Sequence, residues 1–207
     1  MSYRDFTLMA ACRTFGLSLD SRADIHRDTL TIEPSSFLTT LLEENVPLGV
    51  AIHTEKARSE CIVSPILIEV RRLAGRRISL FSGVDFEVDR DRGLVGVCDF
   101  LLTRSPNQLF IEVPAVAIVE AKKDDIKAGL GQCAAEMVAA QMYNEREGQG
   151  PSVIHGVVTT GSLWRFLRLE GQSLQIDQSD YAIDVVGKIL GALLHCVGEA
   201  EPTPVLA

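Results

Sequence analysis

Two short runs contain the residues whose types and spacing allow chemistry. The first, residues 97–102 (Val-Cys-Asp-Phe-Leu-Leu), includes Asp99, and the second, residues 117–123 (Ala-Ile-Val-Glu-Ala-Lys-Lys), includes Glu120 and Lys122. Both runs are apolar and bounded by Gly, Pro or polar turn residues, which is typical of β-strands. Because side chains alternate between the two faces of a strand, Glu120 and Lys122 point the same way.

A carboxylate and an ammonium group at the end of an apolar strand are costly to bury unless they have a use. If the strand of Asp99 lies beside the strand of Glu120, two carboxylates and one lysine converge. Such a trio can hold a hard divalent cation and activate a water molecule. The alternative is a structural ion pair at the sheet edge, joining Asp99 or Glu120 to Lys122 or Lys123.

An Asp, a spacer containing a hairpin, and then Glu-x-Lys resemble the PD-(D/E)XK nuclease superfamily. The chain is similar to bacterial members of this superfamily over roughly residues 50–170, although Cys98 stands where the name-giving proline would be. The residues that match the motif are Asp99, Glu120, Ala121 and Lys122.

The resemblance implies an α/β (α+β) protein with the restriction-endonuclease-like fold, in which helices flank a central mixed β-sheet. It also implies a magnesium (or manganese) ion held by Asp99 and Glu120, with the carbonyl of Ala121 as a third ligand. Lys122 would orient or deprotonate the attacking water, or offset charge developing on the phosphate. The expected substrate is nucleic acid, with DNA as the first choice, and the expected working form is a homodimer.

Two further positions follow from the resemblance. The superfamily often places another glutamate on the helix before its sheet, and a glutamine on the helix after Glu-x-Lys approaches the site. Glu55 and Glu60 lie in the stretch that matches the first position best, Glu69 is a third candidate, and Gln132 matches the second position. The alternative is a solvated charged face for the glutamates and an ordinary polar helix edge for Gln132.

The densest basic cluster surrounds Gly75 and is a candidate for phosphate contact; it contains Arg71, Arg72, Arg76 and Arg77. Cations are also favoured near a helix C-terminus, so a purely structural role is the alternative. The formal net charge of −8 argues against tight, sequence-independent binding of DNA, because such binding usually depends on a basic surface.

The elements expected to position these residues alternate between helices and strands. Helices are predicted over 3–14, from Pro34 to about Pro47, over 48–75 with a kink or restart at Pro65, from Asp124–Asp125 to about Gly148, and after Asp180. Strands are predicted over 29–32, 78–88, 94–103, 109–113, 115–121, 153–159, 163–169 and, as an edge strand, 172–176.

Length and composition indicate one globular domain over residues 1–198, with an N-terminal helical extension to about residue 47 and a loose tail at 199–207. No apolar run reaches the length of a membrane span and no signal peptide is recognisable. The five cysteines are scattered and odd in number, which favours a reducing cytoplasm over disulfides or a zinc site.

Two other functions compete with the nuclease. The same fold, with its site retained, can serve as a binding or assembly module without catalysis, and the acidic charge favours this alternative. Residues 129–134 (Gly-Leu-Gly-Gln-Cys-Ala) also match the residue spacing of a dinucleotide-binding fingerprint. That motif must join a strand directly to the start of a helix, whereas these glycines fall inside a predicted helix, so nucleotide binding is disfavoured.

Overall fold

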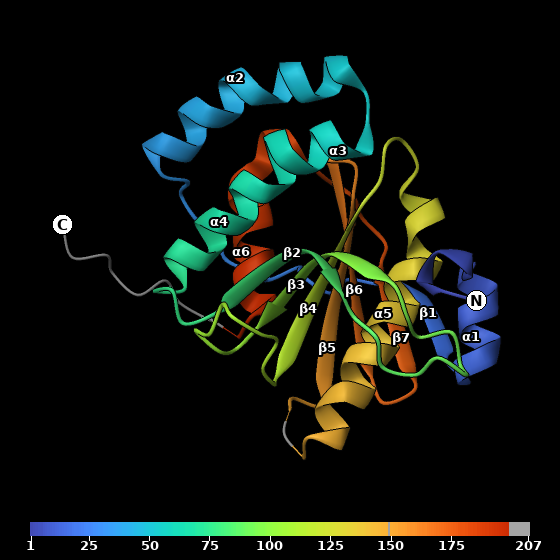
Figure 1. Ribbon diagram of the computed structural model, residues 1–207. Helices are drawn as coiled ribbons and strands as arrows, with labels where there is room; N and C mark the ends of the chain where they lie inside the picture. Colours follow the sequence, from blue (N-terminus) through green and yellow to red (C-terminus); the bar gives the residue numbers. More distant parts are fainter. Residues whose placement is uncertain (149, 199–207) are drawn as a thin grey trace.

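A computed structural model describes residues 1–148 and 150–198; the predicted tail at 199–207 lies outside the described residues. The protein is a mixed α/β structure built on an eight-stranded sheet in the order β1-β7-β6-β5-β4-β3-β2, with β8 pairing to β6 (Figure 1). The strands are β1 Ser18–Ala23, β2 Ser79–Asp85, β3 Val97–Thr103, β4 Ala115–Ala121, β5 Val153–Thr159, β6 Leu163–Glu170, β7 Ser173–Asp177 and β8 Tyr181–Ala182.

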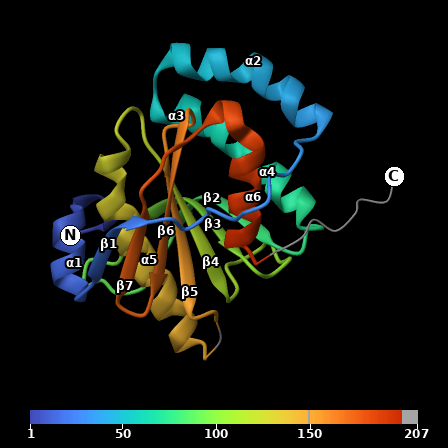
Figure 2. The ribbon, with the colours of Figure 1, turned by 180° about the vertical axis from the view of Figure 1, so that it is seen from behind.

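Helices cover both faces of this sheet. They are α1 Leu8–Phe15, α2 Ser36–Ile52, α3 Glu55–Arg58, α4 Ser64–Leu73, α5 Ile126–Arg146 and α6 Val186–Cys196, with 3₁₀ turns η1 Tyr3–Asp5 and η3 Ile183–Val185 and a π-helical turn η2 Ser59–Val63. Helices α1 and α5 lie on one face, and α2, α4 and α6 lie on the other (Figures 1 and 2). Among the described residues, no helix combines the length and apolar character needed to cross a membrane.

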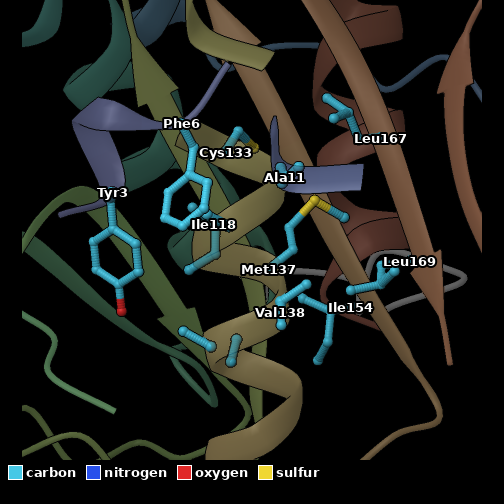
Figure 3. Packing of buried hydrophobic residues seen from close by; sticks show 14 of the residues in the cluster. Tyr3, Phe6, Ala11, Ile118, Cys133, Met137, Val138, Ile154, Leu167 and Leu169 are labelled. Atoms are coloured by element: carbon cyan, nitrogen blue, oxygen red, sulfur yellow. The ribbon is translucent and has the colours of Figure 1, made fainter. Parts of the chain in front are cut away.

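Each face of the sheet has its own hydrophobic core. On the α5 face, Phe6 of the N-terminal segment packs with Ile118, Cys133 and Met137 (Figure 3). On the other face, Trp164 and many further apolar side chains are buried beneath α4 and α6. Strand β4 is buried along its whole length, because it lies in the middle of the sheet and has helices above and below it.

Strands β4 and β5 run parallel and are joined by α5, whereas β3 and β4 run antiparallel. A parallel pair needs a long crossover, which α5 supplies. The predicted bounds of β4 and β5 are confirmed, and so is the start of α5, where the Asp125 side chain accepts a hydrogen bond from the Lys127 N–H at 2.8 Å.

Several predicted helix boundaries are wrong. The helix predicted over residues 3–14 is two pieces, because Thr7 caps a new helix by accepting from the Ala10 N–H. Helix α2 continues through Pro47 to Ile52; the proline lies on the exposed side, while Gly49 keeps close contact with Ile62. Asp180 does not cap the last helix but forms a bidentate ion pair with Arg165.

Two predicted strands are absent from the described residues. Residues 29–32 run alongside α6 without pairing in the sheet, and the Ile32 N–H donates to Gly187 O at 2.9 Å. Residues 109–113 form a loop in which Glu112 accepts from Asn107 Nδ2 at 2.7 Å. The strand predicted at the edge, β7, is internal instead, because β1 pairs with it in parallel.

Candidate active site

Asp99 and Glu120 lie on neighbouring strands at one end of the sheet. The antiparallel register pairs Phe100 of β3 with Val119 of β4, which places Asp99 opposite Glu120. The N–H of Ala121 donates to Asp99 Oδ2 at 2.9 Å and fixes the orientation of that carboxylate. Side chains that stand opposite each other in an antiparallel pair are close neighbours, so the register itself brings the two carboxylates together.

Lys122 follows β4 and completes the group. Its Nζ donates a short hydrogen bond to Glu120 Oε1 and a 3.3 Å hydrogen bond to Gln132 Oε1. The same Nζ lies 3.5 Å from Glu55 Oε1. The Lys122 N–H donates to Thr159 O of β5 at 2.7 Å, which ties the lysine backbone to the neighbouring strand. The structure thus brings together five side chains that the sequence nominated.

These side chains open onto a pocket of about 580 Å³. Its walls are formed by the first turn of the chain, which contributes Arg4, by β2 at Ser82 and Gly83, and by α3 and η2. Gly83 has a φ of 61°, and apart from its two chain neighbours no heavy atom of the described residues lies within 4 Å of where its Cβ would be. This part of the pocket wall is therefore open. Glu60 lines the pocket too, with its carboxylate 3.3 Å from Lys56 Nζ.

Burial dominates the electrostatics of the two carboxylates. It raises the pKa of Glu120 to about 8, with the negative charge of Asp99 adding to the rise and Lys122 opposing it. Burial likewise raises the pKa of Asp99, against the hydrogen bond from Ala121 and the charge of Lys122. For Lys122, burial lowers the pKa, but the surrounding carboxylates, Glu120 above all, outweigh burial and raise it. The lysine is therefore a cation at neutral pH.

A buried polar chain leads from Lys122 into the core. Gln132 accepts from Lys122 through its Oε1 and donates through Nε2 to Glu136 Oε1 at 3.1 Å. Glu136 is completely buried, and burial raises its pKa well above the ordinary range. Among the described residues, Glu120 Oε2 and Glu136 Oε2 are buried atoms without a hydrogen-bond partner.

Other nominated residues lie away from this pocket. Glu69 accepts from the Ser35 N–H at 3.0 Å and forms a bidentate pair with Arg72, and Arg71 donates to Gln108 Oε1 at 3.1 Å. The cluster Arg71, Arg72, Arg76 and Arg77 precedes β2, whose first residue pairs with Thr103. That end of the sheet is opposite to the end that contains Asp99 and Glu120.

The glycines of the dinucleotide-like sequence serve packing inside α5. A Cβ on Gly129 would lie 2.6 Å from Val158 Cγ1 and 3.0 Å from Lys122 Cγ. A Cβ on Gly131 would lie 2.3 Å from the backbone oxygen of Phe6. One glycine thus makes room for the Lys122 stem, and the other lets the N-terminal segment approach the helix.

The residues present suit a hard divalent cation. Within residues 1–148 and 150–198, no three His, Cys, Asp or Glu side chains are arranged to hold a metal ion together. Magnesium retains several waters and needs few protein carboxylates. Asp99 and Glu120 supply two, and both favour a positive neighbour because burial has raised their pKa values. The unpartnered Glu120 Oε2 is a free ligand atom.

Comparison with known proteins adds no assignment, since no protein-family model and no curated protein matches the chain. Two residues near the site were not nominated from the sequence. Glu136 had a detectable pattern, because it lies four residues after Gln132 on one helical stripe. Arg4 had none, since its place in the pocket depends on how the N-terminal segment packs against α5.

Proposed function

We propose that the protein is a metal-dependent nuclease with the restriction-endonuclease-like fold and that it hydrolyses phosphodiester bonds of DNA. One observation carries the proposal: Asp99 and Glu120 face each other on adjacent strands, with Lys122 against them, at the floor of an open pocket. If the Asp and the Glu-x-Lys matched the sequence motif only by chance, their side chains would not be expected to converge in this way. The site at the end of a mixed sheet with helices on both faces agrees with the fold named in the proposal.

Each residue then has a role. Asp99 and Glu120, together with the Ala121 carbonyl, would hold a magnesium or manganese ion, which when bound polarises the phosphate and lowers the pKa of a coordinated water. Lys122 is cationic at neutral pH, so its role is to orient the attacking water and offset charge on the phosphate, and not to remove a proton. Gln132 and Glu55 hold the Lys122 ammonium group in place.

Plasmid cleavage in the presence of magnesium or manganese tests the proposal. Lys122→Ala and Asp99→Ala should each lower the cleavage rate by at least about 100-fold. Lys123→Ala is the matched control, because this neighbouring lysine is half-exposed and its Nζ lies 3.8 Å from Asp124 Oδ2. Circular dichroism should show that all variants fold. Cleavage at the wild-type rate by either site variant would contradict the assignment.

The second candidate is a module of the same fold that binds without cleaving. The observation that favours it is the acidic net charge of −8, together with the engagement of Lys122 by three side chains of the protein itself. A wild-type protein that binds DNA but leaves plasmid intact with both metals would support this alternative.

A further inference from the structure

The pocket wall formed by the N-terminal segment contains a positive charge with no counterpart in the sequence motif. Arg4 belongs to η1 and lines the same pocket as Asp99, Glu120 and Lys122. The guanidinium therefore shares one pocket with the proposed metal ligands.

The backbone around Arg4 is firmly anchored. Tyr3 is buried, its hydroxyl donates to Phe86 O at 2.8 Å, and its N–H donates to Val95 O at 3.1 Å. Phe6 is buried on the other side and packs against α5 (Figure 3). Because a buried residue lies on either side of it, Arg4 is displayed from a fixed stretch of chain even though its own side chain is exposed.

The Arg4 guanidinium is available to a ligand. Within the described part of the chain, it forms no hydrogen bond or ion pair. By contrast, Arg72 and Arg165 each form bidentate pairs with a carboxylate. On the facing wall, Lys56 lies 3.3 Å from Glu60. Arg4 is therefore the cation of the pocket that is best placed to receive an external anion.

We propose that Arg4 binds a phosphate group of the substrate strand, so that the N-terminal segment is part of the substrate-binding site. This inference rests on the proposed function. The ligand must contact two positive groups at once: the cation held by the carboxylate pair, and Arg4. It must therefore be an anion with several oxygens. A phosphodiester fits, because the planar guanidinium matches two phosphate oxygens in a bidentate geometry. The site thus takes a nucleic-acid strand without the distant arginine cluster at Arg71–Arg77.

Binding of fluorescein-labelled DNA tests this inference without requiring turnover. Fluorescence anisotropy is measured with one single-stranded oligonucleotide and one duplex, over a range of salt concentrations, with calcium in place of magnesium. The proteins are wild type, Arg4→Gln, Arg4→Lys and Arg13→Gln. Arg13 is the matched control, because it is an exposed arginine of α1 that lines no part of the pocket and has no ion pair among the described residues.

Arg4→Gln should weaken binding about tenfold and reduce the slope of log K against log salt by nearly one unit, as expected for the loss of one phosphate contact. Arg4→Lys should keep the salt slope, because the charge remains, but bind with intermediate affinity, because the bidentate geometry is lost. Arg13→Gln should bind as wild type. All variants should retain the wild-type melting temperature, since both side chains are exposed.

Three results would overturn the inference: no binding of either DNA by wild type, wild-type binding by Arg4→Gln, or equal weakening by Arg4→Gln and Arg13→Gln. These results are distinguishable from failure of the proposed function. If wild type cleaves plasmid but Arg4→Gln binds DNA normally, the proposed nuclease activity is supported and phosphate binding by Arg4 is contradicted. If no protein cleaves plasmid and Arg4→Gln alone loses DNA binding, phosphate binding by Arg4 is supported and the proposed hydrolysis is contradicted.

Discussion

At the scale of single residues, the dominant fact is that two carboxylates face each other with little solvent. Burial raises the pKa of Glu120 to about 8, repulsion from the charge of Asp99 adds to the rise, and Lys122 opposes the two effects only in part. A divalent cation between them would remove the repulsion. We therefore expect magnesium to raise the melting temperature: at tenfold excess over its Kd the gain is about 1.4 kcal/mol, or roughly 3–6 °C.

Differential scanning fluorimetry at pH 8 with and without magnesium measures this effect. Asp99→Asn and Glu120→Gln should abolish the response to the metal. Asp177→Asn is the control, because Asp177 is also buried but accepts hydrogen bonds from Ser179 and Tyr181 away from the site. That variant should be less stable yet respond to magnesium as wild type does. An equal response in all four proteins would argue against a cation between Asp99 and Glu120.

At the scale of elements, α5 is constrained by its glycines. Replacing a helical glycine by alanine ordinarily stabilises a protein by about 1 kcal/mol, but here the sign should reverse. Gly131→Ala would place a methyl group against the backbone of Phe6, and overpacking of this kind costs roughly 1–3 kcal/mol. Gly129→Ala should cost less, because it meets the side chains of Val158 and Lys122. Urea unfolding measures both, with the exposed Lys127→Ala expected to change little.

The turn between α3 and α4 explains how a proline is tolerated in the middle of a helical region. Pro65 lies in the first turn of α4, where its missing N–H is tolerated, and it follows a π-helical turn in which the Ser64 N–H donates to Ser59 O, five residues earlier. Asn45 of α2 binds the same π-helical turn, since its Nδ2 donates to Cys61 O at 3.2 Å. Asn45→Ala should therefore cost about 1–2 kcal/mol in unfolding free energy. Thr40→Ala, on the exposed side of α2, should cost much less; equal costs would contradict the role of Asn45.

Elements with a strong apolar pattern were predictable from the sequence, and elements defined by their partners were not. Strands β4 and β5 are apolar on both faces and were located to the residue. Strand β1 is largely exposed and polar, so only its pairing with β7 identifies it. The apolar residues Leu109 and Phe110 suggested a strand, yet both are exposed in a loop held by Glu112.

The candidate site shows the same division. Strand alternation, which the local sequence records, places Glu120 and Lys122 on one face, whereas the pairing that brings Asp99 beside them is seen only in the structure. Choosing Glu55 over Glu60 and Glu69 required the direction in which α3 approaches the end of the sheet. The contribution of Arg4 required the packing of its neighbour Tyr3 against Phe86, which lies far along the chain. Such long-range packing has no local pattern from which it can be inferred.

At the scale of the whole molecule, the face of the sheet that is covered by α4 and α6 contains a second group of ionisable residues, well separated from the pocket. His26 and His155 are buried, and the ring of the exposed His195 lies 5.3 Å from that of His26 and 5.7 Å from that of His155, centroid to centroid. Burial lowers the pKa of His26 to about 4 and that of His155 to about 3, and neighbouring positive charges, including Arg104 and Arg168 beside His155, add to the effect.

This cluster should make the fold sensitive to acid. The unfolded chain protonates histidine near pH 6.5, whereas the folded chain resists protonation down to about pH 3–4, so acid favours unfolding as the pH falls from 6.5 towards 4.

The carboxylates with raised pKa act in the opposite direction, so the test is a difference between variants. The destabilisation caused by His155→Gln should shrink by about 3 kcal/mol between pH 7 and pH 4, because the variant lacks the group that must be protonated. Urea unfolding across this range measures it. His53→Gln is the control, since His53 is half-exposed, lies 3.3 Å from Asp124 and is not part of the buried histidine cluster. A His155→Gln effect that stays constant with pH would show that the buried ring does not resist protonation.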